Sequence, residues 1–309
     1  MKHALLRTAA LRTTALLASF AVASAAGAQA PAPAAPPAPA KPTAPAPAAS
    51  GPQFKEIAFE GAKPAAAELF RKHLDASGGE AAWSSKTSIR STGAIEIPAA
   101  GLKGSMTLVA MEPDRMLVTM ELPGMGETRT GSDGTTGWSI DPMRGPALMD
   151  EKQLADIRRD ANFRRDLVLA KDAGNAEVLG LFEFEGAPCW RVKVTGAGST
   201  KETHHFYAKD TGLLTGMSMR MATPMGEIPA VIVVGDYKDF GDVKLPAKTV
   251  TKVMGQQQVM TTDAVTWGGI DEKSFELPAE IKALKAAQPA TAAPAAPAAP
   301  AAPAAPAAK

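Results

Sequence analysis

The chain has 309 residues, and its 33 lysines and arginines almost balance its 32 aspartates and glutamates, giving a formal net charge of +1 at pH 7. Nucleic-acid binding usually requires a basic excess on one face, so this balance excludes that class of function. The single cysteine, Cys189, excludes an intrachain disulfide. We expect Cys189, beside Trp190 in a strand-like run, to be a small buried apolar residue.

The N-terminus has the pattern of a secretory signal peptide. It combines a basic start, an apolar stretch and a small-residue cleavage site, formed by Lys2, Arg7 and Arg12, by residues 15–23, and by Ala26, Gly27 and Ala28. The apolar stretch is well short of the roughly 20 residues that span a bilayer. We therefore predict cleavage near Ala28 and a mature chain in the periplasm without an integral membrane segment.

Composition divides the remainder. Residues 29–52 and 286–309 are almost entirely alanine and proline, cannot bury apolar surface, and are predicted to be a disordered linker and tail of extended, semi-rigid chain. Residues 53–285 are long enough for one domain with a sizeable core.

Helical patterns occur in the first and middle parts of this domain. Pro64 begins a stripe through Leu69, Phe70 and Leu74 that Gly78 and Gly79 end, and a short helix is expected over residues 80–83. Asp150, with Gln153 three residues later, resembles a capping box for a helix extending to residue 161. The basic run after it is interleaved with acids, so we expect a solvated helix face with local ion pairs; its residues are Asp156, Arg158, Arg159, Asp160, Arg164, Arg165 and Asp166.

Elsewhere the apolar period is two, which predicts strands with one apolar face. The apolar positions are Met106, Leu108 and Ala110; Met116, Val118, Met120 and Leu122; and Met217, Met219 and Met221. Hairpin turns are predicted at Asp133-Gly134, at residues 210–212 and at Gly241-Asp242, where glycine supplies a positive φ. Pro246 follows the last turn and suggests a hairpin near a sheet edge. The expected fold is α+β, a strongly curved antiparallel sheet carrying a few helices on its concave side.

Catalytic and metal-binding patterns are missing from the sequence. His204 and His205 are adjacent in a strand and so face opposite ways, and His73 is expected to pack, partly exposed, on the first helix. No metalloprotease, nucleophile-elbow or phosphate-loop motif occurs. We predict no enzymatic activity, no cofactor and no metal site.

Methionine is enriched, with 14 residues against 10 phenylalanines and 2 tyrosines. Flexible, polarizable thioethers suit a cavity that receives ligands of varied shape, although an ordinary core in which methionine fills gaps gives the same composition. A copper site on the Met217 strand is disfavoured because one strand face spaces the sulfurs widely. We predict an apolar cavity lined by Met106, Leu108, Met116, Val118, Met120, Met217, Met219 and Met221.

Four segments occur in the order of a known pattern. Residues 132–142, 206–214, 237–246 and 270–278 resemble the hairpins and later elements of the outer-membrane lipoprotein carrier and lipoprotein-sorting family (LolA/LolB-like), over about residues 64–284. The resemblance implies an unclosed β-barrel wrapped around helices, with an apolar cavity for acyl chains.

Two functional hypotheses follow. The first is a periplasmic, non-enzymatic carrier or binder of lipid or of acylated lipoproteins, in which cargo is held by hydrophobic burial. The second is a cell-envelope protein-interaction module, whose sheet is a scaffold with a filled core and whose partners are other envelope proteins.

Overall fold

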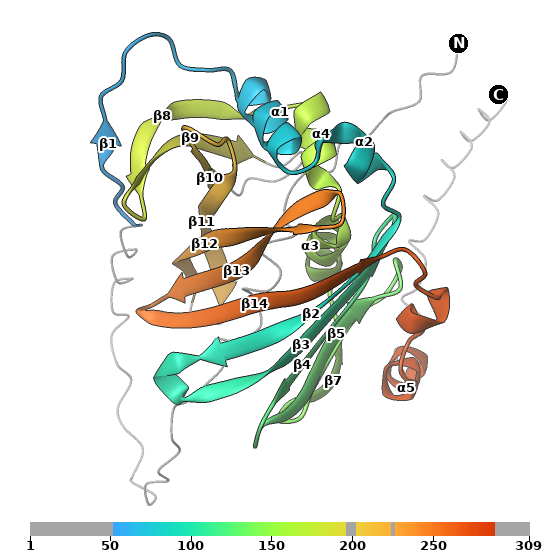
Figure 1. Cartoon of the computed structure of the whole chain (residues 1–309). Helices are drawn as coiled ribbons and strands as arrows, with labels where there is room; N and C mark the ends of the chain where they lie inside the picture. The colour runs from blue at the N-terminus through green and yellow to red at the C-terminus, as the bar shows by residue number, and fades with distance from the viewer. Residues whose placement is uncertain (1–51, 196–201, 224–225, 288–309) are drawn as a thin grey trace, which may run out of the picture.

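A computed structural model describes residues 52–195, 202–223 and 226–287 (Figure 1). The predicted signal peptide, residues 1–28, lies outside these ranges, as does almost all of the predicted linker and tail. The described chain forms one antiparallel sheet of 14 strands in the order β1-β8-β9-β10-β11-β12-β13-β14-β2-β3-β4-β5-β6-β7. Its outermost strands, β1 and β7, pair with one neighbour each, so the sheet does not close.

The strands are β1 (Glu56–Ile57), β2 (Ser88–Ile97), β3 (Leu102–Met111), β4 (Arg115–Leu122), β5 (Gly126–Ser132), β6 (Gly137–Asp141), β7 (Gly145–Leu148), β8 (Glu177–Phe184), β9 (Ala187–Thr195), β10 (Glu202–Ala208), β11 (Leu214–Thr223), β12 (Gly226–Phe240), β13 (Val243–Val253) and β14 (Gln256–Trp267). The helices are α1 (Ala66–Ala76), α2 (Gly79–Ser84), α3 (Glu151–Ala161), α4 (Arg165–Lys171) and α5 (Ala279–Ala287), with short 3-10 turns at Pro98–Ala100 and Glu272–Phe275. The predicted α+β fold, an unclosed antiparallel sheet around a few helices, is confirmed.

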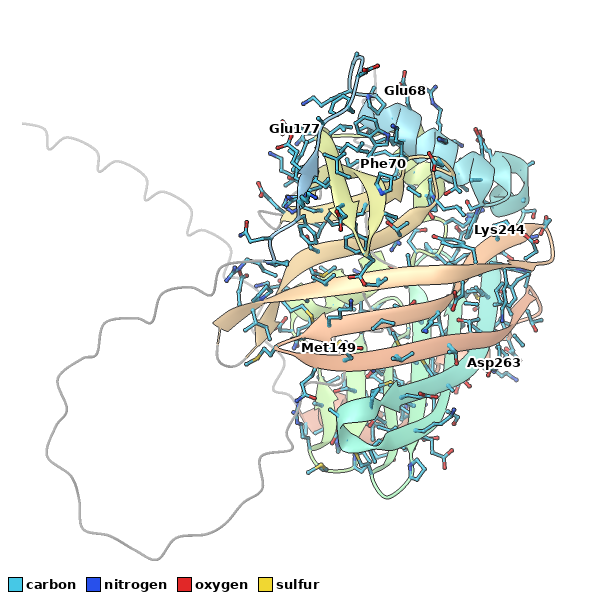
Figure 2. The ribbon with its side chains drawn as sticks, turned by 60° about the vertical axis from the view of Figure 1, so that its left-hand side comes forward. Glu68, Phe70, Met149, Glu177, Lys244 and Asp263 are labelled. Carbon is cyan, nitrogen blue, oxygen red and sulfur yellow. The ribbon has the colours of Figure 1, made fainter. Side chains whose placement is uncertain are left out.

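The helices begin and end where local chemistry predicts. The capping box of α3 forms, because Asp150 Oδ1 accepts from the Gln153 amide at 2.7 Å and Gln153 Oε1 accepts from the Asp150 amide at 3.0 Å. α1 ends before Gly78 and Gly79, whose φ angles are 124° and 81°. Figure 2 shows α1 with Glu68 directed to solvent and Phe70 beneath the helix, where it is 2% exposed. Helix α1 therefore turns its apolar face toward the sheet.

Close strand contacts at two glycines accompany the curvature of the sheet. A Cβ added at Gly93 of β2 would lie 1.7 Å from the carbonyl oxygen of Thr261, and one added at Gly104 of β3 would lie 1.9 Å from that of Glu121. The register of β14 against β2 shifts next to Gly93, between Thr262 and Ala264. Backbones approach more closely here than any side chain permits, and the resulting bulge bends the sheet.

Alanine at Gly93 should therefore destabilise the fold. We expect Gly93→Ala to lower the free energy of unfolding by about 2–4 kcal/mol, because the clash is with backbone that cannot rotate away. Gly235→Ala in β12 is the matched control, since a Cβ there has nothing within 4 Å. Urea unfolding of both variants measures the difference, and equal midpoints would show that the close contact does not shape the sheet.

The predicted hairpins form, with one correction. Gly241, at φ 76°, and Asp242 connect β12 to β13, and Phe240 pairs with Val243. The expected edge position is wrong, because β13 lies between β12 and β14. Pro246 is tolerated inside the sheet beside a local irregularity. It pairs with Tyr237, and the residue before Tyr237 in β12, Asp236, has a φ of 52°.

Candidate functional site

The concave face of the sheet carries the predicted lining residues. Met106 and Leu108 lie on β3, Met116, Val118 and Met120 on β4, and Met217, Met219 and Met221 on β11. All except Met221 are 8% exposed or less, and Met221 is partly buried. The strand alternation read from the sequence therefore places them on one face.

The structure does not bring these side chains into one wall. The residues of β3 and β4 pack in a cluster with Trp83 of α2 and Ile157 of α3. Those of β11 pack in a second cluster with Leu69 and Phe70 of α1. Helix α4 lies between the clusters, because Leu167 belongs to the first and Leu169 to the second. Helices thus occupy the space predicted to be a cavity.

The interior is packed at the centre of each cluster. Met217 is 0% exposed, and Met116 and Val118 are each 1% exposed. A side chain beside a water-sized space would show a larger accessible area, so these residues contact protein on all sides. An acyl chain can reach them only if a helix moves.

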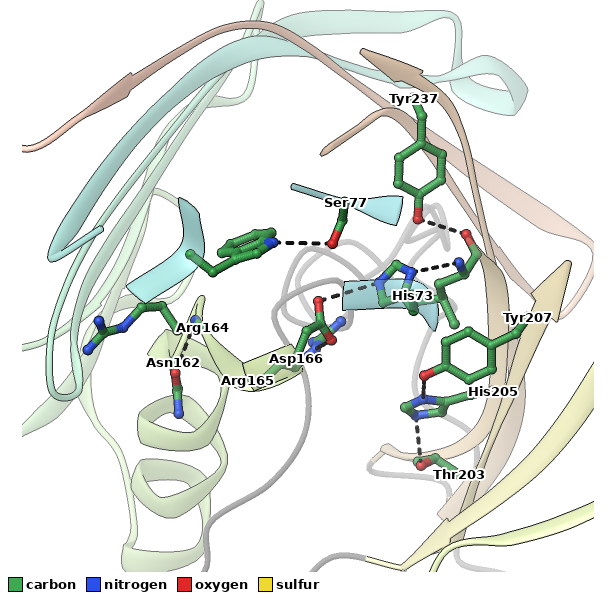
Figure 3. A network of polar contacts seen from close by, with 12 residues as sticks. His73, Ser77, Asn162, Arg164, Arg165, Asp166, Thr203, His205, Tyr207 and Tyr237 are labelled. Carbon is green, nitrogen blue, oxygen red and sulfur yellow. Dashed lines mark hydrogen bonds and ion pairs between the residues drawn. The ribbon is translucent and has the colours of Figure 1, made fainter. Parts of the chain in front are cut away.

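A polar network crosses this apolar interior and joins α1, α4 and the sheet (Figure 3). His73 of α1 is 5% exposed, and its Nδ1 accepts from the backbone amide of Leu214 on β11 at 3.2 Å. The ring proton is therefore on Nε2, which lies 3.5 Å from Asp166 Oδ2 on α4. His73 fixes the first helix to both the sheet and the fourth helix.

Asp166 is the acidic centre of the network. Burial alone would raise the pKa of its carboxyl group, but the contact with His73 and the charge of Arg165 outweigh burial and hold that pKa well below its usual range. Arg165 Nε lies 3.6 Å from Asp166 Oδ1, and the Arg165 side chain is 6% exposed. Asp166 is thus an ionised carboxylate on the concave side of the unclosed sheet, which we call the half-barrel.

Strand β10 contributes a second polar row to the same interior. His205 Nδ1 lies 3.3 Å from the hydroxyl of Tyr207, and His205 Nε2 lies 3.4 Å from Thr203 Oγ1. Burial raises the pKa of Tyr207 well above its usual value, and the charge of Asp166 adds to this, so the phenol stays protonated. His204 faces the other way and contacts Arg191 at 2.8 Å, which confirms that the adjacent histidines point to opposite sides.

Sequence reasoning missed the network. His73 was expected to be partly exposed and Arg165 and Asp166 to lie on a solvated face, whereas His73 and Arg165 are buried. The prediction of a solvated helix face with ion pairs is confirmed for Arg158, which pairs with Asp114 at 3.0 Å near the surface. The missed signal is the break between α3 and α4, because the new helix turns Arg165 inward. Cys189 is buried as expected, and burial raises the pKa of its thiol.

The lowered pKa of Asp166 makes the free energy of unfolding depend on pH in the acidic range. Its contribution is complete above the unfolded-chain value of about 3.9 and is lost as the pH falls from there toward the folded value. We expect Asp166→Asn to lower the free energy of unfolding at pH 7 by about 2 kcal/mol and to flatten its decline between pH 5 and pH 3. Urea unfolding across that range measures both effects, and parallel curves would contradict the role of Asp166.

An opening of about 710 Å³ lies at the start of α1. Leu69 and Trp190, two residues of the second cluster, form its apolar side. Lys72 also lines the opening, and its ammonium group donates to the carbonyl oxygens of Lys209 and Asp210 at 2.9 and 3.0 Å. At this opening, Leu69 and Trp190 lie at the boundary between solvent and the second cluster.

The described residues hold no group of three or more histidine, cysteine, aspartate or glutamate side chains placed to bind a metal ion. Among the helices of the described ranges, none has the length and apolarity needed to cross a membrane.

Comparison with solved structures gives low-identity matches over most of the chain. A LolA superfamily protein from Nitrosomonas europaea has a TM-score of 0.49 at 13% identity, covering 70% of this chain and 99% of that chain. An outer-membrane lipoprotein-sorting protein domain from Vibrio parahaemolyticus has a TM-score of 0.48 at 13% identity, covering 68% of this chain and 95% of that chain. With TM-scores below 0.5, the likenesses assign no ligand or partner to this chain.

No family model matches the chain. An ornithine carbamoyltransferase from Clavibacter sepedonicus is 32% identical over 114 residues, which are 35% of this chain and 36% of that enzyme. The chain thus spans about a third of this curated relative, and the activity of that enzyme is not carried over.

Proposed function

We propose that this protein is a periplasmic, non-enzymatic carrier or binder of lipid or lipoprotein acyl chains. The cargo takes the place of the helices against the methionine-bearing face of the sheet. The observation that carries the proposal is the apolar concave face of a sheet that does not close, covered by short helices and divided into two clusters by α4. The sequence resemblance to the lipoprotein carrier family supports the same cargo.

In this proposal an acyl chain replaces α1 as the apolar cover of part of the sheet. Leu69 and Phe70 of α1 leave the second cluster, and an acyl chain enters from the opening beside Trp190. Each buried methylene contributes about 0.8 kcal/mol, so a long acyl chain can compensate for the lost helix contacts. Methionine side chains adapt to the new shape because they have three rotatable bonds and a polarizable sulfur.

Cargo can be detected directly. Native mass spectrometry of protein purified from the cell envelope should show a bound lipid, and a fluorescent fatty acid should bind saturably and be displaced by unlabelled fatty acid. Absence of both signals would contradict the proposal.

Locking α1 to the sheet should block uptake reversibly. A Cβ added at Gly212 would lie 2.5 Å from Lys72 Cγ, so Lys72→Cys with Gly212→Cys places two thiols within disulfide reach. Native Cys189 is buried and does not compete. We expect the oxidised variant to lose most acyl-probe binding and the reduced variant to regain it, measured on one preparation before and after reductant. Equal binding in both states would show that α1 does not move.

Substitutions at two methionines of β11 should distinguish an effect on folding from an effect on ligand binding. Met217 is 0% exposed at the centre of the second cluster, whereas Met221 is partly buried at its margin. We expect Met217→Glu to lower the free energy of unfolding by several kcal/mol, because it buries an unpaired charge. Met221→Glu can keep its charge hydrated and should melt near the native temperature with weaker probe binding. Native probe binding by Met221→Glu would remove β11 from the proposed site.

The alternative function, a cell-envelope interaction module, is favoured by the packed interior. Met116, Val118 and Met217 contact protein on all sides, as a scaffold with a filled core requires. This alternative expects no bound lipid, no effect of the disulfide lock, and a partner protein that depends on surface residues. The native mass spectrum therefore distinguishes the two functions.

A further inference from the structure

The exposed apolar side chains of the described residues gather at one end of the sheet. The large ones are Met125 at 40% exposure, Met143 at 75% and Met254 at 62%. Each lies in a hairpin connection, between β4 and β5, β6 and β7, and β13 and β14. Strands that alternate in direction place these three connections at the same end of the sheet, which we call the methionine rim, defined by Met125, Met143 and Met254.

Neighbouring tips of the rim touch. A Cβ added at Gly126, beside Met125, would lie 3.0 Å from Pro142 Cγ, beside Met143. The hairpin between β2 and β3, with exposed Pro98, Ala99 and Ala100, lies between these tips and that of Met254 in the strand order. The rim is therefore a row of small and apolar tips across neighbouring strands.

The opposite end of the sheet is polar and is occupied by helices. Lys72 of α1 contacts the β10–β11 turn, Lys86 beyond α2 pairs with Asp242 of the β12–β13 turn, and Arg164 beside α4 pairs with Glu112 at the end of β3. Figure 1 shows α1, α2 and α4 at the top and the β2–β3 and β13–β14 ends at the left. The two ends of the half-barrel thus differ in chemistry.

Charges near the methionine rim are largely paired. Lys103 contacts Glu96 at 2.6 Å, and Arg129 contacts Glu127 at 3.2 Å. A rim with balanced charge matches a zwitterionic surface and gains little from an anionic one. Separated apolar tips also do not supply the continuous area, about 800 Å² a side, that a stable protein interface needs. A lipid surface accepts separate apolar side chains without shape complementarity.

We propose that the methionine rim docks reversibly on the surface of a zwitterionic lipid bilayer, with Met125, Met143 and Met254 inserted at the boundary between headgroups and acyl chains. The docking is peripheral and does not involve the opening beside α1. It holds the helix-covered end of the half-barrel away from the bilayer.

Flotation with phosphatidylcholine vesicles tests the proposal with the full-length protein. We expect the wild-type protein to float with the vesicles equally at low and high salt. Each serine substitution should weaken binding about tenfold, and the Met125→Ser, Met143→Ser, Met254→Ser triple variant should not float. The matched triple variant with leucine at the same positions should keep binding, because leucine is apolar and of similar size.

Insertion can be observed at a single tip. Met143→Cys, labelled with an environment-sensitive dye, should shift to shorter wavelength on vesicles, whereas Lys209→Cys at the opposite end should not. A wild-type protein that fails to float, a serine triple variant that floats normally, or binding that salt abolishes would each overturn the proposal. Self-association that serine removes, with no vesicle binding, would assign the rim to a second copy of the chain and also overturn it.

Discussion

A curved sheet that does not close must cover its concave apolar face, and every other feature of this fold depends on that constraint. No second sheet is described, so short helices supply the cover, and each helix has only one apolar stripe. Two clusters form in place of one core because α4 divides the concave space between β3–β4 and β11. The covering helices take no part in the ladder of hydrogen bonds that joins the strands.

The polar network defines where the cover sits. Purely apolar packing would allow α1 to slide along the sheet with little loss, whereas His73 has partners in fixed directions on Leu214 and Asp166. Compared with apolar side chains of the same size, a buried ion pair adds little net stability, because desolvation cancels much of the attraction. Removing Asp166 alone costs more, because His73 and Arg165 then lose their carboxylate partner. The network therefore defines the position of α1 against α4 and the sheet.

Sequence reasoning succeeded where structure is local and failed where it is not. Turn glycines, the capping box at Asp150 and the two-residue period of β3, β4 and β11 depend on neighbours in the chain, and all form as predicted. Arg165 and Pro246 were misplaced because their surroundings come from distant segments. The division of the methionine face into two clusters was equally hidden, since a strand pattern gives the face of each side chain but not what covers it.

The two ends of the half-barrel differ in the side chains that they expose. Helices are attached to one end through ion pairs at turns, where Asp242 and Glu112 meet lysine and arginine. The methionine tips lie at the other end, where the ion pairs Lys103–Glu96, Arg129–Glu127 and Lys252–Glu185 join strands and turns of the sheet. Opening of α1 would occur near the polar end, where Lys72 contacts the β10–β11 turn. The proposed docking at the methionine rim would leave the α1 end free, so docking and exchange of the apolar cover would not compete for the same residues.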